Sequence, residues 1–253
     1  MSWIRGLRYA RRYRNWREIA RARARREKPG RAVLRDGTRF DAPPGTNVVR
    51  VVTPVFHKNV YTPPGLELRP DDVVVDVGAN IGAFAVWAGQ RTHGRLLAIE
   101  PHPDNAEFLR RNLRANGVER AEVAQCAVAD KPGTLPLFLG SSGTTHRIVG
   151  GPRDGEGDAS IDVPVVPLPQ LLAERGFERV DFLKLDCEGA EGLILPNLPD
   201  ALFRGIRAIA LEFHDSMSPV AHEELAKLLS ERGFRVSQIW DGKTHNGMLF
   251  AHR

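Results

Sequence analysis

The turn that follows an apolar stretch at residues 72–77 carries the residue types of a ligand-binding loop. It reads Asp76-Val-Gly-Ala-Asn-Ile-Gly82, with Gly78 and Asn80 inside it. Glycines let a backbone approach a ligand closely, although close packing of a strand and a helix explains them too. The spacing differs from the Gly-x-Gly-x-x-Gly pattern of dinucleotide-binding proteins, and Asp76 would repel a pyrophosphate. A cationic group, such as an α-amino group, suits this carboxylate better.

Two more carboxylates follow the next two expected strands. Glu100 ends residues 96–100, where an acidic residue of nucleoside-binding α/β proteins accepts hydrogen bonds from both ribose hydroxyls. Asp130 follows residues 121–127, at a place from which it could bind the exocyclic amine of adenine. A turn or helix-capping role explains Asp130 equally well. Glu100 and the loop together favour a nucleoside ligand.

Three carboxylates, Asp186, Glu188 and Glu191, follow the apolar strand expected at residues 180–186. Such clustering away from basic partners suggests a functional site. Solvent exposure is enough to explain Glu191, whereas Asp186 and Glu188 at a central strand tip need another reason. His214 follows the next expected strand and suits a general base, a metal ligand or a structural histidine equally well.

These side chains need a sheet whose strands end at one edge. From residue 70 onward, apolar stretches of strand length alternate with helical patterns, which is typical of a mostly parallel sheet with helices on both faces. Strands are expected at residues 72–77, 96–100, 121–127, 135–139, 180–186 and 206–213, with a closing antiparallel hairpin of 234–239 and 248–251. Helices are expected at residues 82–91, 104–116 and 219–232. The prediction is one Rossmann-like α/β domain over residues 70–253.

Residues 140–160 interrupt this alternation with a stretch rich in glycine, serine, threonine and aspartate. Long loops in compact domains are commonly lids or binding loops, although a tolerated surface insertion is an alternative. We therefore expect a mobile loop that takes part in substrate choice, with Thr144, Thr145 and His146 as candidate contacts.

Composition limits the class of protein. The 253 residues, 42% hydrophobic and 26% charged, suit one soluble domain with an appendage. Cys126 and Cys187 cannot supply a disulfide framework, which favours a reducing cytoplasm. No apolar run approaches the ~18 residues of a membrane span, and arginines stand where a signal peptide would be apolar.

The positive charge belongs to the first 31 residues. The chain carries +5, but residues 1–31 contain twelve Lys and Arg against Glu18 and Glu27, which leaves −5 for residues 32–253. A generally basic nucleic-acid-binding domain is therefore not indicated. Apolar residues recur in this arm at three- and four-residue steps, namely Trp3, Leu7, Ala10, Tyr13, Trp16 and Ala20.

This spacing predicts that the arm is a basic amphipathic helix. Such a helix could dock on its own domain or on a twin subunit of a homodimer, or lie on an anionic membrane at the inner face. Residues 32–69 are expected to form an N-terminal β cover: two strands joined by an Asp36-Gly37 turn, then a proline-containing approach through residues 48–52 to Tyr61.

Five ordered motifs together resemble the FkbM-type methyltransferase family. They read Val-Asp-Val-Gly-Ala-Asn-Ile-Gly at 75–82, Ala-Ile-Glu-Pro-His-Pro-Asp-Asn at 98–105, Arg-Asn-Leu-Arg-Ala-Asn at 111–116, Lys-Leu-Asp-Cys-Glu-Gly-Ala-Glu at 184–191 and Leu-Glu-Phe-His at 211–214. The resemblance covers residues 55–214. Residues 1–31 and the loop 140–160 lie outside the common pattern, so substrate choice is expected to depend on them.

The resemblance implies a seven-stranded class I fold that binds S-adenosylmethionine and O-methylates sugars, polyketides or other secondary metabolites. Carried over by position, Asp76, Gly78, Asn80 and Gly82 would hold the methionine part of the cofactor. Glu100 would bind the ribose and Asp130 the adenine. Asp186 and Glu188 would lie near the transferred methyl group, with Asp186 also contacting the cofactor and Glu188 the acceptor.

Methyl transfer to an oxygen needs alignment of donor and acceptor and removal of the hydroxyl proton. His214 or Asp186 is the predicted base, and His146 on the loop is a third candidate. A divalent metal held by Asp186, Glu188 and His214 is an alternative way to lower the pKa of the acceptor. The acceptor is expected to be a small molecule or a glycan.

Three rival functions use the same fold. An RNA-directed methyltransferase would use the basic arm, but Asp-Cys-Glu-Gly at 186–189 differs from the Asn/Asp-Pro-Pro-Tyr/Phe pattern of enzymes that methylate base amines. A non-catalytic module would keep the fold to hold the cofactor or only a partner, but the intact carboxylates Asp76, Glu100 and Asp186 argue against such decay. A NAD-dependent oxidoreductase would need the absent Gly-x-Gly-x-x-Gly motif. A nucleic-acid partner is thus disfavoured.

Overall fold

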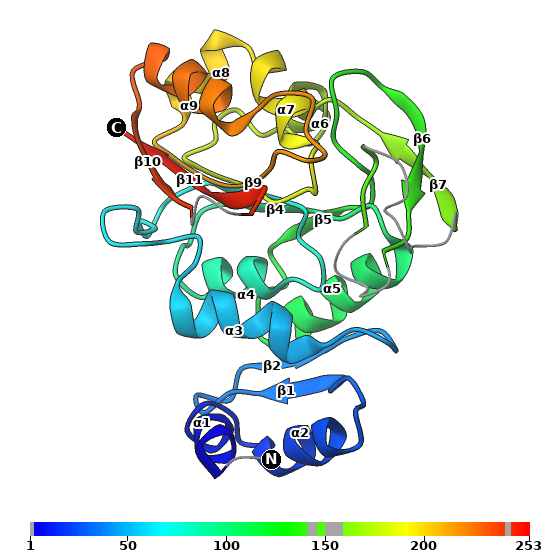
Figure 1. The fold of residues 1–253 in the computed structure, drawn as a ribbon. Coiled ribbons are helices and arrows are strands. Elements are labelled where there is room, and N and C mark those ends of the chain that lie inside the picture. Colours follow the sequence, from blue (N-terminus) through cyan, green and yellow to red (C-terminus); the bar gives the residue numbers. More distant parts are fainter. Residues whose placement is uncertain (1–2, 141–145, 150–158, 241–243) are drawn as a thin grey trace.

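A computed structural model describes residues 3–140, 146–149, 159–240 and 244–253. Seven strands form a central sheet in the order β10-β11-β9-β8-β3-β4-β5 (Figure 1). Their bounds are β3 Val74–Val77, β4 Leu96–Ile99, β5 Glu122–Ala124, β8 Phe182–Leu185, β9 Ala208–His214, β10 Arg235–Ile239 and β11 Asn246–His252. Strands β5, β4, β3, β8 and β9 are parallel, and β11 runs antiparallel between β9 and β10. The predicted α/β fold and its closing hairpin are confirmed.

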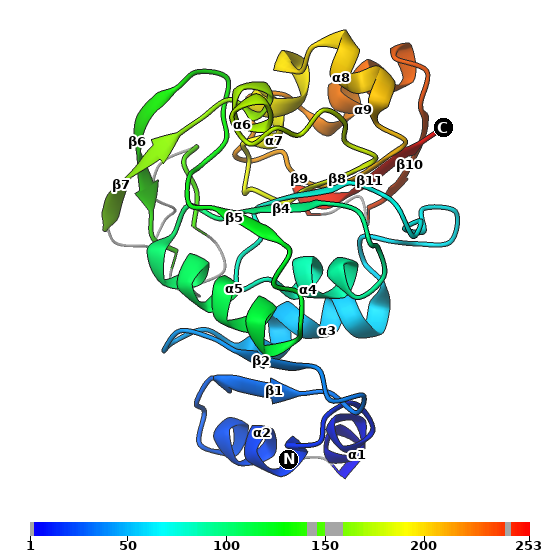
Figure 2. The same ribbon diagram turned by 180° about the vertical axis from the view of Figure 1, so that it is seen from behind.

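Helices cover both faces of this sheet (Figures 1 and 2). On one face lie α3 Val48–Lys58, α4 Ala83–Gly89 and α5 Pro103–Ala115. On the other lie α6 Leu168–Glu174, α7 Glu191–Ile194, the short 3₁₀ helix Leu195–Asn197, α8 Asp200–Gly205 and α9 His222–Glu231. Successive residues of a strand point to opposite faces. Val74 therefore packs in the hydrophobic cluster that contains α3 and α4, and Val75 in the cluster that contains α6 and α9.

Helix α3 occupies residues that the sequence pattern assigns to the proline-containing part of a β cover. Valines favour strands, because branching at Cβ restricts their side chains in a helix. Val48, Val52 and Val55 nevertheless lie on one helical face and are buried in the cluster that contains α4. Tertiary burial therefore overrides local preference here, and residues 32–69 form a hairpin plus a helix.

The arm forms two helices, α1 Trp3–Arg12 and α2 Trp16–Ala24, so the prediction of one continuous helix is wrong. The break comes at Tyr13, which pairs with Leu34 in an isolated β-bridge and is hydrogen-bonded through Oη to Thr53 Oγ1 at 2.7 Å. Tyr13 and Ile19 are fully buried in the cluster shared with β1 Arg31–Val33 and β2 Arg39–Asp41. The arm thus docks on its own chain.

None of the helices in the described ranges is long and apolar enough to cross a bilayer. A second antiparallel hairpin, β6 Gly133–Phe138 with β7 Ser160–Val165, stands outside the main sheet. The predicted strand at 135–139 belongs to this hairpin. Between its strands, residues 141–145 and 150–158 lie outside the described part of the chain, and with them the prediction of a mobile loop.

Candidate functional site

Two pockets lie at the carboxyl ends of the parallel strands, the edge where open α/β sheets bind ligands. The inner pocket lies beside the end of β4 and has an empty volume of about 610 Å³, open solvent included. The outer pocket lies between α3 and the ends of β8 and β9, with about 1550 Å³ on the same measure. Both are lined by Gly78, Asn80, Asp186 and Glu188. A ligand in one pocket would therefore lie next to a ligand in the other.

Gly78 and Asn80 belong to the wall between the pockets. Both have positive φ angles, 76° and 51°. A Cβ atom on Gly78 would lie 1.8 Å from the carbonyl oxygen of Asp186, so only glycine allows the turn after β3 to approach the turn after β8. Gly82 instead begins α4 and packs closely on Leu109, and it lines neither pocket. Simple packing explains Gly82.

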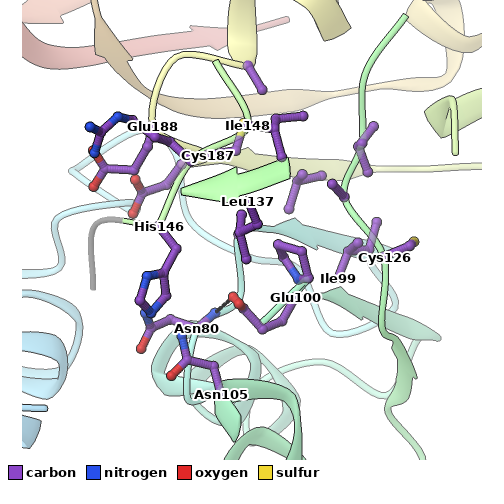
Figure 3. A pocket seen from close by; sticks show the side chains of 18 residues that line it. Asn80, Ile99, Glu100, Asn105, Cys126, Leu137, His146, Ile148, Cys187 and Glu188 are labelled. Atoms are coloured by element: carbon purple, nitrogen blue, oxygen red, sulfur yellow. Dashed lines mark hydrogen bonds between the residues drawn. The ribbon is translucent and has the colours of Figure 1, made fainter. Parts of the chain in front are cut away.

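Glu100 is the buried carboxylate of the inner pocket (Figure 3). It accepts hydrogen bonds from the backbone N–H of Asn80 at 2.8 Å and of His102 at 2.9 Å. Burial raises the pKa of Glu100 to about 7, because these bonds and the one to the Asn105 side chain offset only part of the desolvation. The structure therefore places a strong acceptor where the sequence predicts contact with a ribose.

Glu100→Gln is expected to change how folding depends on pH. The pKa of Glu100 is about 7 in the folded chain against 4.5 ordinarily, so its favourable contribution is complete below pH 4.5 and is lost as the pH rises through 7. The loss is about 3 kcal/mol in wild type and is absent from the variant. Chemical denaturation between pH 4.5 and 8 should show wild-type stability falling relative to Glu100→Gln. A constant difference would contradict the shift, and Glu119→Gln, at an exposed site, is the control.

The remaining wall of the inner pocket is largely apolar. It includes Cys126, Ala127, Val128, Leu137 and Ile148. Asp130 lines neither pocket, contrary to the predicted adenine contact. Strand β5 ends at Ala124. The residues that follow it and line the pocket are the apolar 126–128, which precede Asp130 in the chain.

His146 belongs to the inner pocket and not to the outer one. Its ring stacks on His102 with centroids 4.3 Å apart, and its Nδ1 accepts a hydrogen bond from the N–H of Gly140 at 3.2 Å. His146 lines the inner pocket and His214 lines the outer one, so these two candidate bases do not lie in the same pocket. Thr144 and Thr145 lie outside the described residues.

Asp76 lies behind the ligand-binding turn. It is the register partner of Lys184 on β8, and alternation along both strands directs the two side chains to the α4 face. Lys184 Nζ lies 2.8 Å from Asp76 Oδ1 and donates to the carbonyl oxygen of Gly78 at 2.8 Å. Asp76 is fully buried and lines neither pocket. The structure thus places Asp76 at neither pocket, unlike the predicted contact with the cofactor, and pairs its carboxylate with Lys184.

Tyr61 connects this buried pair to the pockets. Its hydroxyl donates a 2.5 Å hydrogen bond to Asp186 Oδ2, and Lys184 Nζ lies 5.1 Å from the centre of its ring. Burial and the charge of Asp186 raise the pKa of Tyr61 well above its ordinary value, so the phenol remains a donor. In the sequence, Tyr61 is recognised only as the end of the proline-containing approach, and no role is predicted for Lys184. Their neighbours along the chain carry no signal of these contacts.

Glu191 is fully buried, so the prediction that it is a solvated surface acid is wrong. Its carboxylate accepts hydrogen bonds from the N–H of Cys187 at 2.8 Å and of Gly189 at 2.9 Å, and it lies 3.2 Å from His214 Nδ1. Burial would lower the pKa of His214, but the hydrogen bond and charge of Glu191, with the charges of Asp186 and Glu188, raise it to about 10. His214 is therefore a buried cation at neutral pH.

Glu212 is a site residue that sequence analysis did not single out. It lines the outer pocket, and its Oε1 lies 3.9 Å from His214 Nε2. The nearby charge of Asp186, followed by burial, raises the pKa of Glu212 to about 8. Residues two apart on a strand share a face, so alternation along β9 places Glu212 on the same side as His214. That signal is available in the sequence, but the prediction considers only the strand end at His214.

One set of side chains at this edge has metal-ligand spacing. Ligand atoms of Asp186, Glu212 and His214 lie within 4.8 Å of one another, with Glu212 in place of the predicted Glu188. A histidine must be neutral to bind a metal, so a metal at this set would have to displace the proton that Glu191 favours on His214. The set therefore has the spacing of metal ligands, and metal binding there would be coupled to release of that proton.

Comparison with known proteins agrees with this geometry. A family model described as methyltransferase FkbM domain matches residues 76–236. The chain is 32% identical over 213 residues to 31-O-demethyl-FK506 methyltransferase FkbM of Streptomyces tacrolimicus, covering 72% of this chain and 80% of that protein. It is 28% identical over 174 residues to hexuronic acid methyltransferase AglP of Haloferax volcanii, covering 65% and 64%.

The fold is also similar to a solved structure. Methyltransferase FkbM from Methylobacillus flagellatus superposes with a TM-score of 0.53 at 18% identity, covering 79% of this chain and 50% of that one. The chain thus spans about half the length of that structure. Taken together, the matched domain, the 32% identical relative and the fold show that the chain belongs to the FkbM methyltransferase family, whose members use S-adenosylmethionine.

Proposed function

We propose that the protein O-methylates a hydroxyl group of a glycan or a secondary metabolite, with S-adenosylmethionine in the inner pocket and the acceptor in the outer one. The observation that carries this is the shared wall: Gly78, Asn80, Asp186 and Glu188 line both pockets. A donor and an acceptor held on either side of that wall would meet beside Asp186. The names of the relatives, an O-demethyl-FK506 methyltransferase and a hexuronic acid methyltransferase, support acceptors of these two kinds.

The inner pocket fits the cofactor in its polarity. Glu100 offers a buried acceptor for ribose hydroxyls, and the apolar stretch 126–128 offers a surface for the adenine ring. The turn at Gly78 and Asn80 leaves backbone accessible beside the outer pocket, as the methionine part requires. These assignments give Asp76 and Gly82 supporting positions behind the turn.

Asp186 is the base in this proposal. When bound, S-adenosylmethionine would supply an electrophilic methyl group, which the acceptor oxygen would take over from the sulfur. The hydroxyl proton passes to the Asp186 carboxylate, which Tyr61 orients from the side of Lys184. With a pKa of about 8, Glu212 is largely protonated at pH 7, and His214 already holds its proton. Neither is a base in that state, and both surround Asp186 with hydrogen-bonding groups.

Calorimetric titration with S-adenosylhomocysteine tests the cofactor half of the proposal. At a pH above the pKa of about 7, where Glu100 is ionised, wild type should bind it and Glu100→Gln should bind about 100-fold more weakly. Each hydrogen bond between a charged acceptor and a hydroxyl contributes about 1.5 kcal/mol. Glu119→Gln should bind like wild type. Equal affinity of wild type and Glu100→Gln would remove Glu100 from the cofactor site, and tight binding of NAD instead would remove the methyltransferase assignment of the inner pocket.

Transfer of labelled methyl groups to glycan and metabolite fractions tests the acceptor half. Products should carry the label as a base-stable methyl ether. Label in methyl esters or in N-methyl groups would contradict O-methylation of a hydroxyl. Activity should survive exhaustive chelation, because in this proposal the Asp186 carboxylate takes the proton without a metal. Loss of activity would instead assign a metal to Asp186, Glu212 and His214.

A further inference from the structure

We propose that the outer pocket selects an acceptor with an anionic group, a carboxylate or a phosphate, which Arg50 and Lys58 of helix α3 bind while the reacting hydroxyl faces Asp186. This inference rests on the proposed function, because it takes the outer pocket as the acceptor site. Both cations line that pocket. Neither was singled out by the sequence, where they stand in a valine-rich stretch.

The two cations lie on the same side of α3. Arg50, Pro54 and Lys58 are four residues apart in turn, the spacing that repeats along one helical face, and all three line the outer pocket. The cations are thus separated by about 12 Å along the helix axis. Helix α3 contains no Asp or Glu. Within the described ranges, neither Arg50 nor Lys58 makes an ion pair or a hydrogen bond through its side chain.

The facing wall has the opposite charge, carried by Asp186 and Glu188, which line the outer pocket after the end of β8. Glu212 on β9 lines it too but is largely protonated at pH 7. The cations nearest to them are already engaged, Lys184 with Asp76 and His214 with Glu191. An anionic group is therefore repelled from the strand ends and attracted to α3.

This division of charge orients an acceptor as well as selecting it. An acceptor bound with its anionic group on Arg50 or Lys58 must turn its neutral part toward Asp186, where a hydroxyl can lose its proton. Without the two cations, the carboxylates at the strand ends would select against any anion, so the helix reverses the preference of the pocket. Between the cations, Val51, Pro54 and Val55 give the acceptor an apolar surface.

Binding to the complex with S-adenosylhomocysteine tests the proposal. The probes are two matched pairs: p-nitrophenyl β-D-glucuronide against p-nitrophenyl β-D-glucoside for the carboxylate, and glucose 1-phosphate against glucose for the phosphate. Within at least one pair, the anionic member should bind about tenfold or more tightly than the neutral one, as expected for a charge-assisted contact. The pair that shows the preference identifies the anion.

The double variant Arg50→Gln/Lys58→Gln should lose this preference while its affinity for S-adenosylhomocysteine stays unchanged. Both side chains are exposed, so folding should be unaffected, and a thermal melt checks this. The control is Arg114→Gln/Lys131→Gln, which removes two exposed cations outside the pocket and should keep the preference.

Equal binding within both pairs, no binding of any probe, or a preference that survives in the double variant would overturn the inference. The readouts separate it from the proposed function. Methyl transfer to a neutral acceptor with the same KM in wild type and double variant would leave O-methylation standing and remove anion selection. Anion binding that depends on Arg50 and Lys58, without any methyl transfer, would do the reverse.

Discussion

Replacing Lys184 by methionine is expected to lower the free energy of unfolding by about 3–5 kcal/mol at pH 8, because it leaves a buried carboxylate without its counter-charge. Asp76 is fully buried, and Lys184 Nζ at 2.8 Å is its ion-pair partner. Burial already raises the pKa of Asp76, and Lys184 opposes that rise. In the variant the pKa of Asp76 should rise further, so the loss of stability should be larger at pH 8 than at pH 5.

Denaturant titration of a double-mutant cycle checks this explanation. Asp76→Asn in the Lys184→Met background removes the unpaired charge and should recover more than half of the lost stability. Lys227→Met, at a side chain that is 76% exposed, should change stability by less than about 0.5 kcal/mol. A double variant as unstable as Lys184→Met alone would show that packing, and not the buried charge, explains the loss.

Asp186→Asn is expected to lower kcat by about 100- to 10,000-fold, the usual range for loss of a general base. Asparagine can still accept the hydrogen bond of Tyr61 but cannot take up the acceptor proton. Affinity for S-adenosylhomocysteine should stay within a few-fold of wild type. Single-turnover methyl transfer and calorimetry on the same preparation measure the two effects separately.

The alternative bases give different outcomes in the same assay. If Glu212 were the base, Glu212→Gln would lose as much activity as Asp186→Asn. We expect a smaller loss, because the raised pKa of Glu212 keeps it largely protonated at pH 7. Loss of cofactor affinity in Asp186→Asn in proportion to the loss of activity would assign Asp186 to cofactor binding instead.

The sequence predicted the strand ends that form the site better than the side chains that act there. A strand followed by glycine or by a helix start is a local pattern, and the turn at Gly78, Glu100 and the Asp186 edge all lie at the pockets. The direction of a side chain at a strand end depends instead on its partners in the folded protein. Asp76 and Glu191 carry the same charge as Glu100 and Asp186, yet both point into the protein, where they hold Lys184 and His214.

Helix α3 shows that the type of a secondary-structure element can also depend on tertiary packing. Its valines favour a strand by local preference, and only packing against α4 makes them helical. Arg50 and Lys58 line the outer pocket because this segment is a helix, since an extended chain would place them about 26 Å apart. The positive charge that Arg50 and Lys58 bring to the outer pocket therefore could not be predicted from the sequence.

Local periodicity is enough to predict the sheet and the edge at which the pockets lie, because strands and turns follow from residues that are neighbours in the chain. The ordered motifs are what indicate the family. The contacts that set charge and proton transfer depend on strand order and register. Lys184 meets Asp76 because β8 lies beside β3, and Tyr61 reaches Asp186 across 125 residues. The folded chain alone brings such distant residues together, and it thereby decides which carboxylate is neutralised and which stays available at the pockets.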